Sequence, residues 1–167
     1  MKIKLLLVLC FCSLMSFGQG QKGVIKNGMD CYPFTYKDVN DKEVSLADLK
    51  GKYVLIDVWA TWCSACVGEQ PYLQKLEKAM EGKNIHLVSI SIDAREDVGK
   101  WKKMVQDKKL TGIQLVTAGD FGFMQAFAIR TIPRFILLDP DGKVIEANMT
   151  RPREEATLKT LNALKGI

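Results

Sequence analysis

Two runs of apolar, β-favouring residues dominate the hydrophobic pattern of the chain. They span residues 53–60 (YVLIDVWA) and 85–92 (IHLVSISI), and each would place apolar side chains on both faces of an extended strand. Strands with two apolar faces are typical of a parallel sheet that helices cover on both sides. Between the two runs, residues 67–80 carry apolar side chains at helical spacing. The pattern therefore predicts a strand–helix–strand unit with a right-handed crossover.

Shorter signals flank this unit. Before it, residues 34–45 predict a small hairpin, because Asn40 and Asp41 favour a turn. After it, the pattern predicts a helix at 96–107, a strand at 114–117, a short helix at 121–127, a hairpin at 134–147 and a closing helix around 158–164. No linker-like stretch interrupts residues 34–165, so the sequence predicts a single domain.

The first twenty residues have the layout of a secretory signal peptide. Two lysines precede an uncharged, mostly apolar run at residues 5–17, and Gly-Gln-Gly-Gln follows that run. The run is shorter than the about 20 residues that a membrane span needs. We predict a signal peptide at 1–20, a linker or N-terminal extension at 21–33 and the domain at 34–167. An uncleaved segment that anchors the protein to a membrane is the alternative.

Composition and charge narrow the choice of function. The chain has 167 residues, 47% hydrophobic and 26% charged, with a formal net charge of +5, which suits a globular domain and excludes a disordered or collagen-like chain. Removal of the signal peptide takes away two lysines and leaves 22 basic and 19 acidic residues, a net charge of +3. That excess is too small to indicate binding to nucleic acid, so we predict no nucleic-acid partner.

The cysteines are the most informative residues of the sequence. Cys63-x-x-Cys66 directly follows the first predicted buried strand and opens the predicted helix. Two cysteines three positions apart on a first helical turn can approach the Cα separation of about 5.5 Å that a disulfide requires. Free N–H groups and the helix dipole at the N-terminus favour a thiolate at Cys63. We therefore predict that Cys63 is the nucleophile and that Cys66, one turn deeper, is the resolving thiol.

Other uses of these side chains are less consistent with the spacing. A zinc site would have to combine Cys63 and Cys66 with Cys31 and His86, without a second Cys-x-x-Cys or Cys-x-x-His pair. A permanently oxidised structural disulfide is an alternative, but a three-residue spacing closes too small a loop to add much stability. His86 begins its strand and would lie roughly 20 Å from the redox pair. We predict a structural role for His86, no metal and no cofactor other than the disulfide itself.

The cysteine motif lies in sequence that resembles the thioredoxin superfamily, specifically the exported TlpA/ResA-like thiol-disulfide oxidoreductases. The resemblance covers roughly residues 34–165, and its motifs are VSLADLKGK at 44–52, WATWCSAC at 59–66, Glu69 with Pro71, TIP at 131–133 and DPDGK at 139–143. It implies a thioredoxin-like α/β fold with a central mixed sheet of four to five strands flanked by helices. The predicted hairpin would be an N-terminal extension of that sheet.

The resemblance also implies how a substrate would be bound. Pro133 corresponds to the cis-proline of the family, which faces the redox site. The backbone of Ile132 would then be free to pair with an extended substrate segment, a mode that reads backbone more than side chains. Trp62 would shield the disulfide and contact the substrate. Arg134 stands where threonine is common in the family, and its charge could select acidic partners.

The same resemblance implies roles for two acidic residues. Asp57 sits where thioredoxins keep a buried acid beneath the second cysteine, and it would accept the proton of Cys66. An exposed acid on an edge strand is the alternative. Glu69 matches an acid three residues after the second cysteine and would tune the pKa of the thiols, with an ordinary solvated glutamate as the alternative. Cys31 occupies a usual alanine position and is either a small buried residue or a third thiol for mixed disulfides.

These interpretations combine into one functional hypothesis. We expect an exported, periplasmic, monomeric thiol-disulfide oxidoreductase that acts on protein thiols and disulfides as a reductase. In an oxidising compartment it would need a membrane-bound electron donor or acceptor. A thiol peroxidase is one alternative, although Ala60 occupies the position where that class needs a threonine. A non-catalytic binding module or chaperone is the other alternative.

Overall fold

The computed structural model describes residues 24–167, and the predicted signal peptide with Cys10 and Cys12 lies outside the described residues. The strands are β1 (Thr35–Asp38), β2 (Glu43–Ser45), β3 (Tyr53–Trp59), β4 (Ile85–Ser91), β5 (Ile113–Val116), β6 (Arg134–Leu138) and β7 (Val144–Met149). The helices are α1 (Ser64–Met80), α2 (Val98–Asp107), α3 (Gly122–Ala126) and α4 (Glu155–Asn162), with short 3-10 turns at Leu46–Leu49 and Arg95–Asp97.

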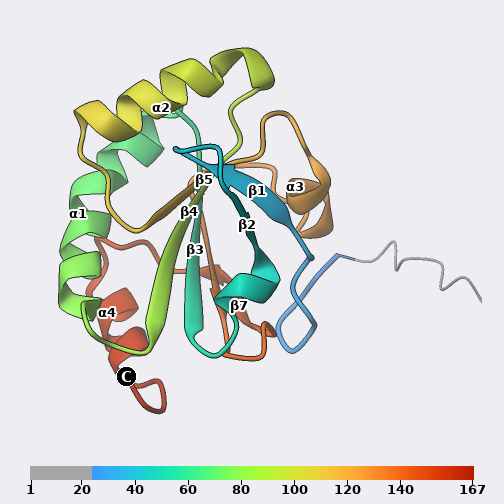
Figure 1. Ribbon diagram of the computed structural model, residues 1–167. Coiled ribbons are helices and arrows are strands. Elements are labelled where there is room, and N and C mark those ends of the chain that lie inside the picture. The colour runs from blue at the N-terminus through green and yellow to red at the C-terminus, as the bar shows by residue number, and fades with distance from the viewer. Residues whose placement is uncertain (1–23) are drawn as a thin grey trace, which may run out of the picture.

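The strands form one mixed sheet in the order β2-β1-β5-β4-β3-β6-β7 (Figure 1). Strands β3, β4 and β5 are parallel, and the other neighbours are antiparallel. The predicted strand–helix–strand unit is therefore β3–α1–β4. The hairpin turn at Asp141-Gly142 also forms as predicted, with Gly142 at a φ of +87°.

The sheet has seven strands, which is more than the four to five that the resemblance implied. The N-terminal hairpin accounts for most of the difference because it joins the sheet rather than standing apart from it. Its first strand pairs with β5, placing Lys37 opposite Val116 and Asp38 opposite Leu115. The described part of the N-terminal extension also lies against the domain, since Gly28 and Cys31 donate backbone hydrogen bonds to Val144 and Gly142.

Both faces of the central strand are covered, as the double apolar pattern predicted. Helices α1 and α4 lie together over one face, where Leu55 of β3 packs in a cluster with Leu73, Leu76 and Leu161 (Figure 1). The other face packs against α2 and α3 through a second cluster that contains Val54, Ile56, Val58, Trp101 and Phe123. The two clusters fix α1, and with it the cysteine motif at its first turn, against the sheet. Among residues 24–167 no helix is long and apolar enough to cross a membrane.

The closing helix offers a matched test of this packing. Leu161 is fully buried against α1 and the sheet, whereas Leu158 on the same helix is 37% exposed. We expect Leu161→Ala to lower the free energy of unfolding by about 2–5 kcal/mol, because it leaves a cavity in the core. The control, Leu158→Ala, should lower it by less than about 1 kcal/mol. Equilibrium unfolding in urea with the disulfide intact measures both, and equal losses would contradict the packing.

Candidate active site

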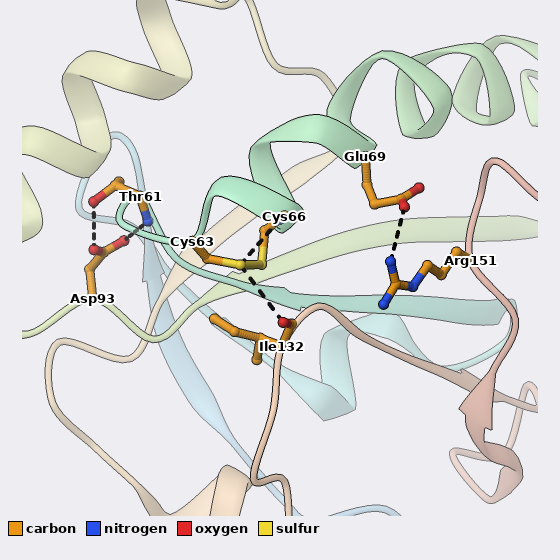
Figure 2. Close-up of a disulfide and its surroundings, with 7 residues drawn as sticks. All are labelled: Thr61, Cys63, Cys66, Glu69, Asp93, Ile132 and Arg151. Carbon is orange, nitrogen blue, oxygen red and sulfur yellow. Dashed lines mark hydrogen bonds and ion pairs between the residues drawn. A yellow bond between two sulfur atoms is a disulfide. The ribbon is translucent and has the colours of Figure 1, made fainter.

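The redox pair lies where the central strand passes into the active-site helix. Cys63 is the N-cap residue of α1, and its sulfur accepts a hydrogen bond from the backbone N–H of Cys66 at 3.1 Å. An atom at this position faces the free N–H groups and the positive end of the helix dipole. Cys63 and Cys66 form a disulfide with a Cα separation of 5.2 Å (Figure 2). The structure thus places both cysteines where their spacing predicted, at the first turn of a helix.

A carbonyl group faces this disulfide from a different part of the chain. The carbonyl oxygen of Ile132 lies 3.8 Å from Sγ of Cys63 (Figure 2). The Ile132–Pro133 peptide bond is cis, as the resemblance implied. A disulfide sulfur carries no hydrogen, so we treat this approach as a contact between the two groups. Ile132 and Pro133 are half-buried, and Trp62 beside Cys63 is 58% exposed. The predicted substrate-contact residues therefore present accessible surface next to the cysteines.

The loop that leads to Cys63 is held by a buried carboxylate. Asp93, two residues beyond the end of β4, accepts hydrogen bonds from the backbone N–H of Thr61 at 3.0 Å and from its hydroxyl at 2.7 Å (Figure 2). The hydroxyl of Ser91 donates to the same carboxylate. These bonds fix the turn two residues before Cys63. Sequence reasoning missed Asp93, because the 32 residues that separate it from Thr61 leave no local signal for the contact.

Asp57 is buried between β3 and α1, with 7% of its surface exposed. Burial raises its pKa to about 7. The hydrogen bond donated by Ser89 at 3.4 Å lowers the pKa, and the charges of Glu69 and Glu77 raise it. The alternative of an exposed acid on an edge strand is wrong, since β3 lies between β4 and β6. A carboxyl with a pKa near neutrality can exchange a proton under physiological conditions.

Glu69 is also buried, so the alternative of an ordinary solvated glutamate is wrong. Its carboxylate accepts a hydrogen bond from Nε of Arg153. The same carboxylate lies 3.7 Å from Nη1 of Arg151 (Figure 2). Both arginines lie between β7 and α4, and Arg153 also packs over the ring of Tyr72 at 5.4 Å. Sequence reasoning missed these partners, which are 82 and 84 residues from Glu69. The ion pairs connect the active-site helix to the start of the closing helix.

The remaining candidate groups lie outside the redox site. Cys31 is a free thiol in the larger core cluster, and burial raises its pKa to about 12, so it is protonated at neutral pH. This favours the small buried residue over a third reactive thiol. His86 lies near the start of β4, opposite Val54, with its pKa lowered by burial and by Lys52. Within residues 24–167 no group of three His, Cys, Asp or Glu side chains is arranged to hold a metal.

Fold and site together define a class of protein: a thioredoxin-like α/β domain that carries a Cys-x-x-Cys disulfide at the N-terminus of a helix. The sequence profile of the Redoxin family matches residues 26–164, and the chain belongs to this family. Its resemblance to the TlpA/ResA-like branch of the thioredoxin superfamily is confirmed by relatives and by solved structures alike.

Two relatives illustrate the sequence similarity. The thiol-disulfide oxidoreductase ResA of Bacillus subtilis (strain 168) is 29% identical over 147 residues, which cover 86% of this chain and 79% of that protein. The protein of the same name from Bacillus thuringiensis (strain Al Hakam) is 31% identical over 139 residues, covering 80% of this chain and 78% of that one.

Two solved structures from Bacteroides vulgatus illustrate the similarity of fold. The solution structure of a candidate thiol-disulfide oxidoreductase is 55% identical, covers 78% of this chain and 84% of its own, and superposes with a TM-score of 0.72. The crystal structure of another candidate thiol-disulfide oxidoreductase is 33% identical, covers 82% and 95%, and gives a TM-score of 0.75.

The raised pKa of Asp57 predicts a specific pH dependence of stability. Between about pH 4, the usual value for an unfolded aspartate, and pH 7, the folded state binds a proton that the unfolded state does not. Rising pH therefore destabilises the fold over this window. We expect Asp57→Asn to remove that effect, so that the variant is more stable than the wild type at pH 8 by up to about 4 kcal/mol.

At pH 4 the two proteins should differ little in this respect, because the carboxyl is then largely protonated in the folded state and half protonated in the unfolded one. Urea unfolding of the oxidised protein at both pH values measures the change. Asp141→Asn, which neutralises an exposed aspartate, supplies the baseline. A stability difference between wild type and Asp57→Asn that stays constant from pH 4 to pH 8 would contradict the shifted pKa.

Proposed function

We propose that this protein is a thiol-disulfide oxidoreductase that exchanges disulfides with protein substrates through Cys63 and Cys66. The observation that carries the proposal is the Cys63–Cys66 disulfide at the N-terminus of α1, with the Ile132 carbonyl against the Cys63 sulfur. The two ResA relatives, which are named thiol-disulfide oxidoreductases, support it.

The exchange proceeds in two displacements. In the reduced protein, the Cys63 thiolate attacks one sulfur of a substrate disulfide, and the other substrate sulfur leaves as a thiolate. The Cys66 thiol then loses its proton and attacks Sγ of Cys63, which releases the second substrate thiolate and forms the Cys63–Cys66 disulfide. Two electrons pass to the substrate. The helix N-terminus favours the thiolate at Cys63, which makes Cys63 both the attacking group and a good leaving group.

Substrate binding uses the surface around the disulfide. An extended substrate segment would pair with the backbone at Ile132, next to Pro133, while the exposed ring of Trp62 covers the segment from the other side of Cys63. Backbone pairing depends little on the substrate's side chains and so permits a range of protein substrates.

Two buried acids assist the exchange. Asp57 accepts the proton of Cys66 when that thiol attacks the mixed disulfide, because its raised pKa suits transfer near neutral pH. The negative charge of Glu69 tunes the pKa of the two thiols. Arg151 and Arg153 hold that charge in a fixed position.

The cellular setting follows from the predicted signal peptide and from the chemistry. We propose that the protein is exported to the periplasm, or remains anchored if its leader is not cleaved, and acts there as a monomeric reductase. Because an oxidising compartment does not regenerate the dithiol, a membrane-bound electron donor would reduce the Cys63–Cys66 disulfide after each turnover.

Removal of the resolving thiol should trap the substrate. We expect reduced Cys66→Ser to accumulate a covalent adduct with a disulfide-containing peptide, since Cys63 still attacks but nothing resolves the mixed disulfide. The adduct should be cleaved by dithiothreitol and be detected by intact-protein mass spectrometry.

Two control variants separate this outcome from unspecific thiol chemistry. Cys63→Ser/Cys66→Ser should form no adduct although it retains Cys31, and Cys31→Ser/Cys66→Ser should still form one. An adduct located on Cys31 would contradict the assignment of Cys63. Noncovalent capture of the same peptide by the double serine variant, without any adduct of Cys66→Ser, would instead favour a binding module.

The role of Asp57 can be separated from that of Cys63 by following the two displacements one at a time. We expect Asp57→Asn to slow resolution by about 10²-fold while the initial attack changes much less, because only resolution needs a base for Cys66. Rapid-mixing kinetics with a chromophoric disulfide measure both steps. Equal slowing of attack and resolution would rule out a specific role as proton acceptor.

A further inference from the structure

A row of buried polar side chains crosses three neighbouring strands beneath α1. The register of the sheet places Asp57 of β3 beside Ser89 of β4, and Ser89 beside Gln114 of β5. Each of the three has less than 10% of its surface exposed. Central parallel strands usually carry apolar residues on both faces, so three adjacent polar side chains on one face call for a physical explanation.

Helix α1 presents polar side chains to the same place. Gln70 and Glu77 are two helical turns apart, and both line a small, partly open cavity together with Asp57, Ser89 and Gln114. The cavity has a volume of about 10 Å³, which is room for about one water molecule.

Several polar atoms in the wall of this cavity have no partner within the protein. They are Nε1 of Trp59, both amide atoms of Gln70 and Oε1 of Gln114. A buried water typically makes two to four hydrogen bonds to such groups. The unpartnered atoms in the wall supply the hydrogen-bond partners that one water molecule in this cavity would need.

Glu77 stands between this cavity and the surface. It lines the cavity and also lines an open hollow of about 710 Å³ on the outside of the molecule, and its side chain is partly exposed. The hydroxyl of Thr111 donates a hydrogen bond to its carboxylate. Gly112 leaves room for that carboxylate, because a Cβ at this position would lie 2.6 Å from Oε1 of Glu77.

We propose that the proton that Asp57 takes from Cys66 leaves the protein through this cavity, by way of a bound water and the Glu77 carboxylate. The inference rests on the proposed role of Asp57 as proton acceptor. The Asp57 carboxylic acid gives its proton to the water, the water passes a proton to Glu77, and Glu77 releases it to solvent. Asp57 and Glu77 both return to the carboxylate form, and no electrons move. When the disulfide is reduced, the same groups carry a proton inward.

The charges around both groups are compatible with this route. Burial raises the pKa of Glu77, and the hydrogen bond from Thr111 lowers it by a smaller amount. The net rise brings the pKa of Glu77 nearer to the raised pKa of Asp57. Asp57 also faces the charge of Glu69. Around Glu77, the hollow carries six further titratable side chains, which are Lys52, Lys78, Glu81, Lys83, His86 and Lys109.

The test compares two neighbouring carboxylates on the full chain. Glu77→Gln removes the proposed relay but keeps the shape of the side chain, and Glu81→Gln removes a carboxylate that lines the hollow but not the cavity. Turnover is measured with dithiothreitol and a disulfide peptide in weak buffer at constant ionic strength. We expect Glu77→Gln to lose at least about tenfold in turnover, as loss of a positioned proton-transfer group does, and Glu81→Gln to match the wild type.

Added imidazole should restore turnover of Glu77→Gln, because a small buffer can carry the proton that Glu77 no longer carries. A purely structural or electrostatic effect would not respond to buffer concentration. The rate of the initial attack by Cys63, which needs no proton from Cys66, should stay unchanged and so report an intact fold. Gln70→Met, which removes the amide from the cavity wall without changing charge, should show the same loss and the same rescue.

The outcomes separate this inference from the proposed function. If Asp57→Asn slows resolution but Glu77→Gln behaves like Glu81→Gln, the exit route is wrong and the role of Asp57 stands. If Glu77→Gln is slow but imidazole does not restore it, Glu77 does not carry the proton and the route is equally wrong. If Asp57→Asn leaves resolution unchanged, both the proposed proton acceptor and the route that depends on it fail.

Discussion

Burial of the Asp57 carboxyl between the central strand and the active-site helix is the constraint on which the site depends. A lone carboxylate in an apolar interior costs several kcal/mol, so the protein either surrounds it with polar groups or shifts its pKa. This protein does both. Ser89 donates a hydrogen bond to Asp57, Gln70 and Gln114 bring further polar atoms to the same cavity, and the pKa nevertheless rises to about 7. The result is a group that can change its protonation state beneath the redox helix near neutral pH.

The cysteines themselves are positioned from three directions. The packing of α1 on the sheet sets the depth of the first helical turn. The buried Asp93 carboxylate fixes the turn at Thr61 just before Cys63, and the loop at Ile132 brings a carbonyl group to 3.8 Å from the Cys63 sulfur. Glu69 adds a fourth connection through Arg153, although the arginine is partly exposed and this ion pair contributes less to stability than its short contact suggests. These contacts hold the backbone on both sides of the disulfide in place.

Local sequence patterns correctly predicted the parts of the fold and site whose residues lie close together in the chain. The two apolar runs predicted β3 and β4, the helical spacing predicted α1, and position alone placed Cys63 and Cys66 at the helix N-terminus. Long-range pairing was not predictable in the same way. The hairpin joins the sheet through β5, whose paired residues lie 77 to 79 positions further along the chain, and no local pattern predicts that contact. The same reason explains why the sequence did not predict the roles of Asp93, Arg151 and Arg153. Each of them contacts a residue more than 30 positions away.

The polar cluster beneath α1 is a different case. The sequence shows Ser89, Gln114 and Glu77 as polar residues, but only the register of the strands shows which of them are neighbours. A serine and a glutamine inside apolar strands are unusual, yet only the alignment of β3, β4 and β5 shows that they continue the row that starts at Asp57. That alignment also explains the polar residues Gln70 and Glu77 of α1, because they line the same cavity as the row. The polar side chains beneath the redox helix then form one cluster around a small cavity rather than a set of isolated exceptions.

The most direct test of this account is a titration of the Asp57 carboxyl by carbon-13 NMR in the oxidised protein. With aspartate labelled at the side-chain carboxyl and Asp57→Asn used to assign the signal, burial predicts a midpoint near pH 7. A midpoint near pH 4, the ordinary value for aspartate, would mean that Asp57 is a permanent carboxylate near neutral pH and would contradict its proposed role as the proton acceptor of Cys66.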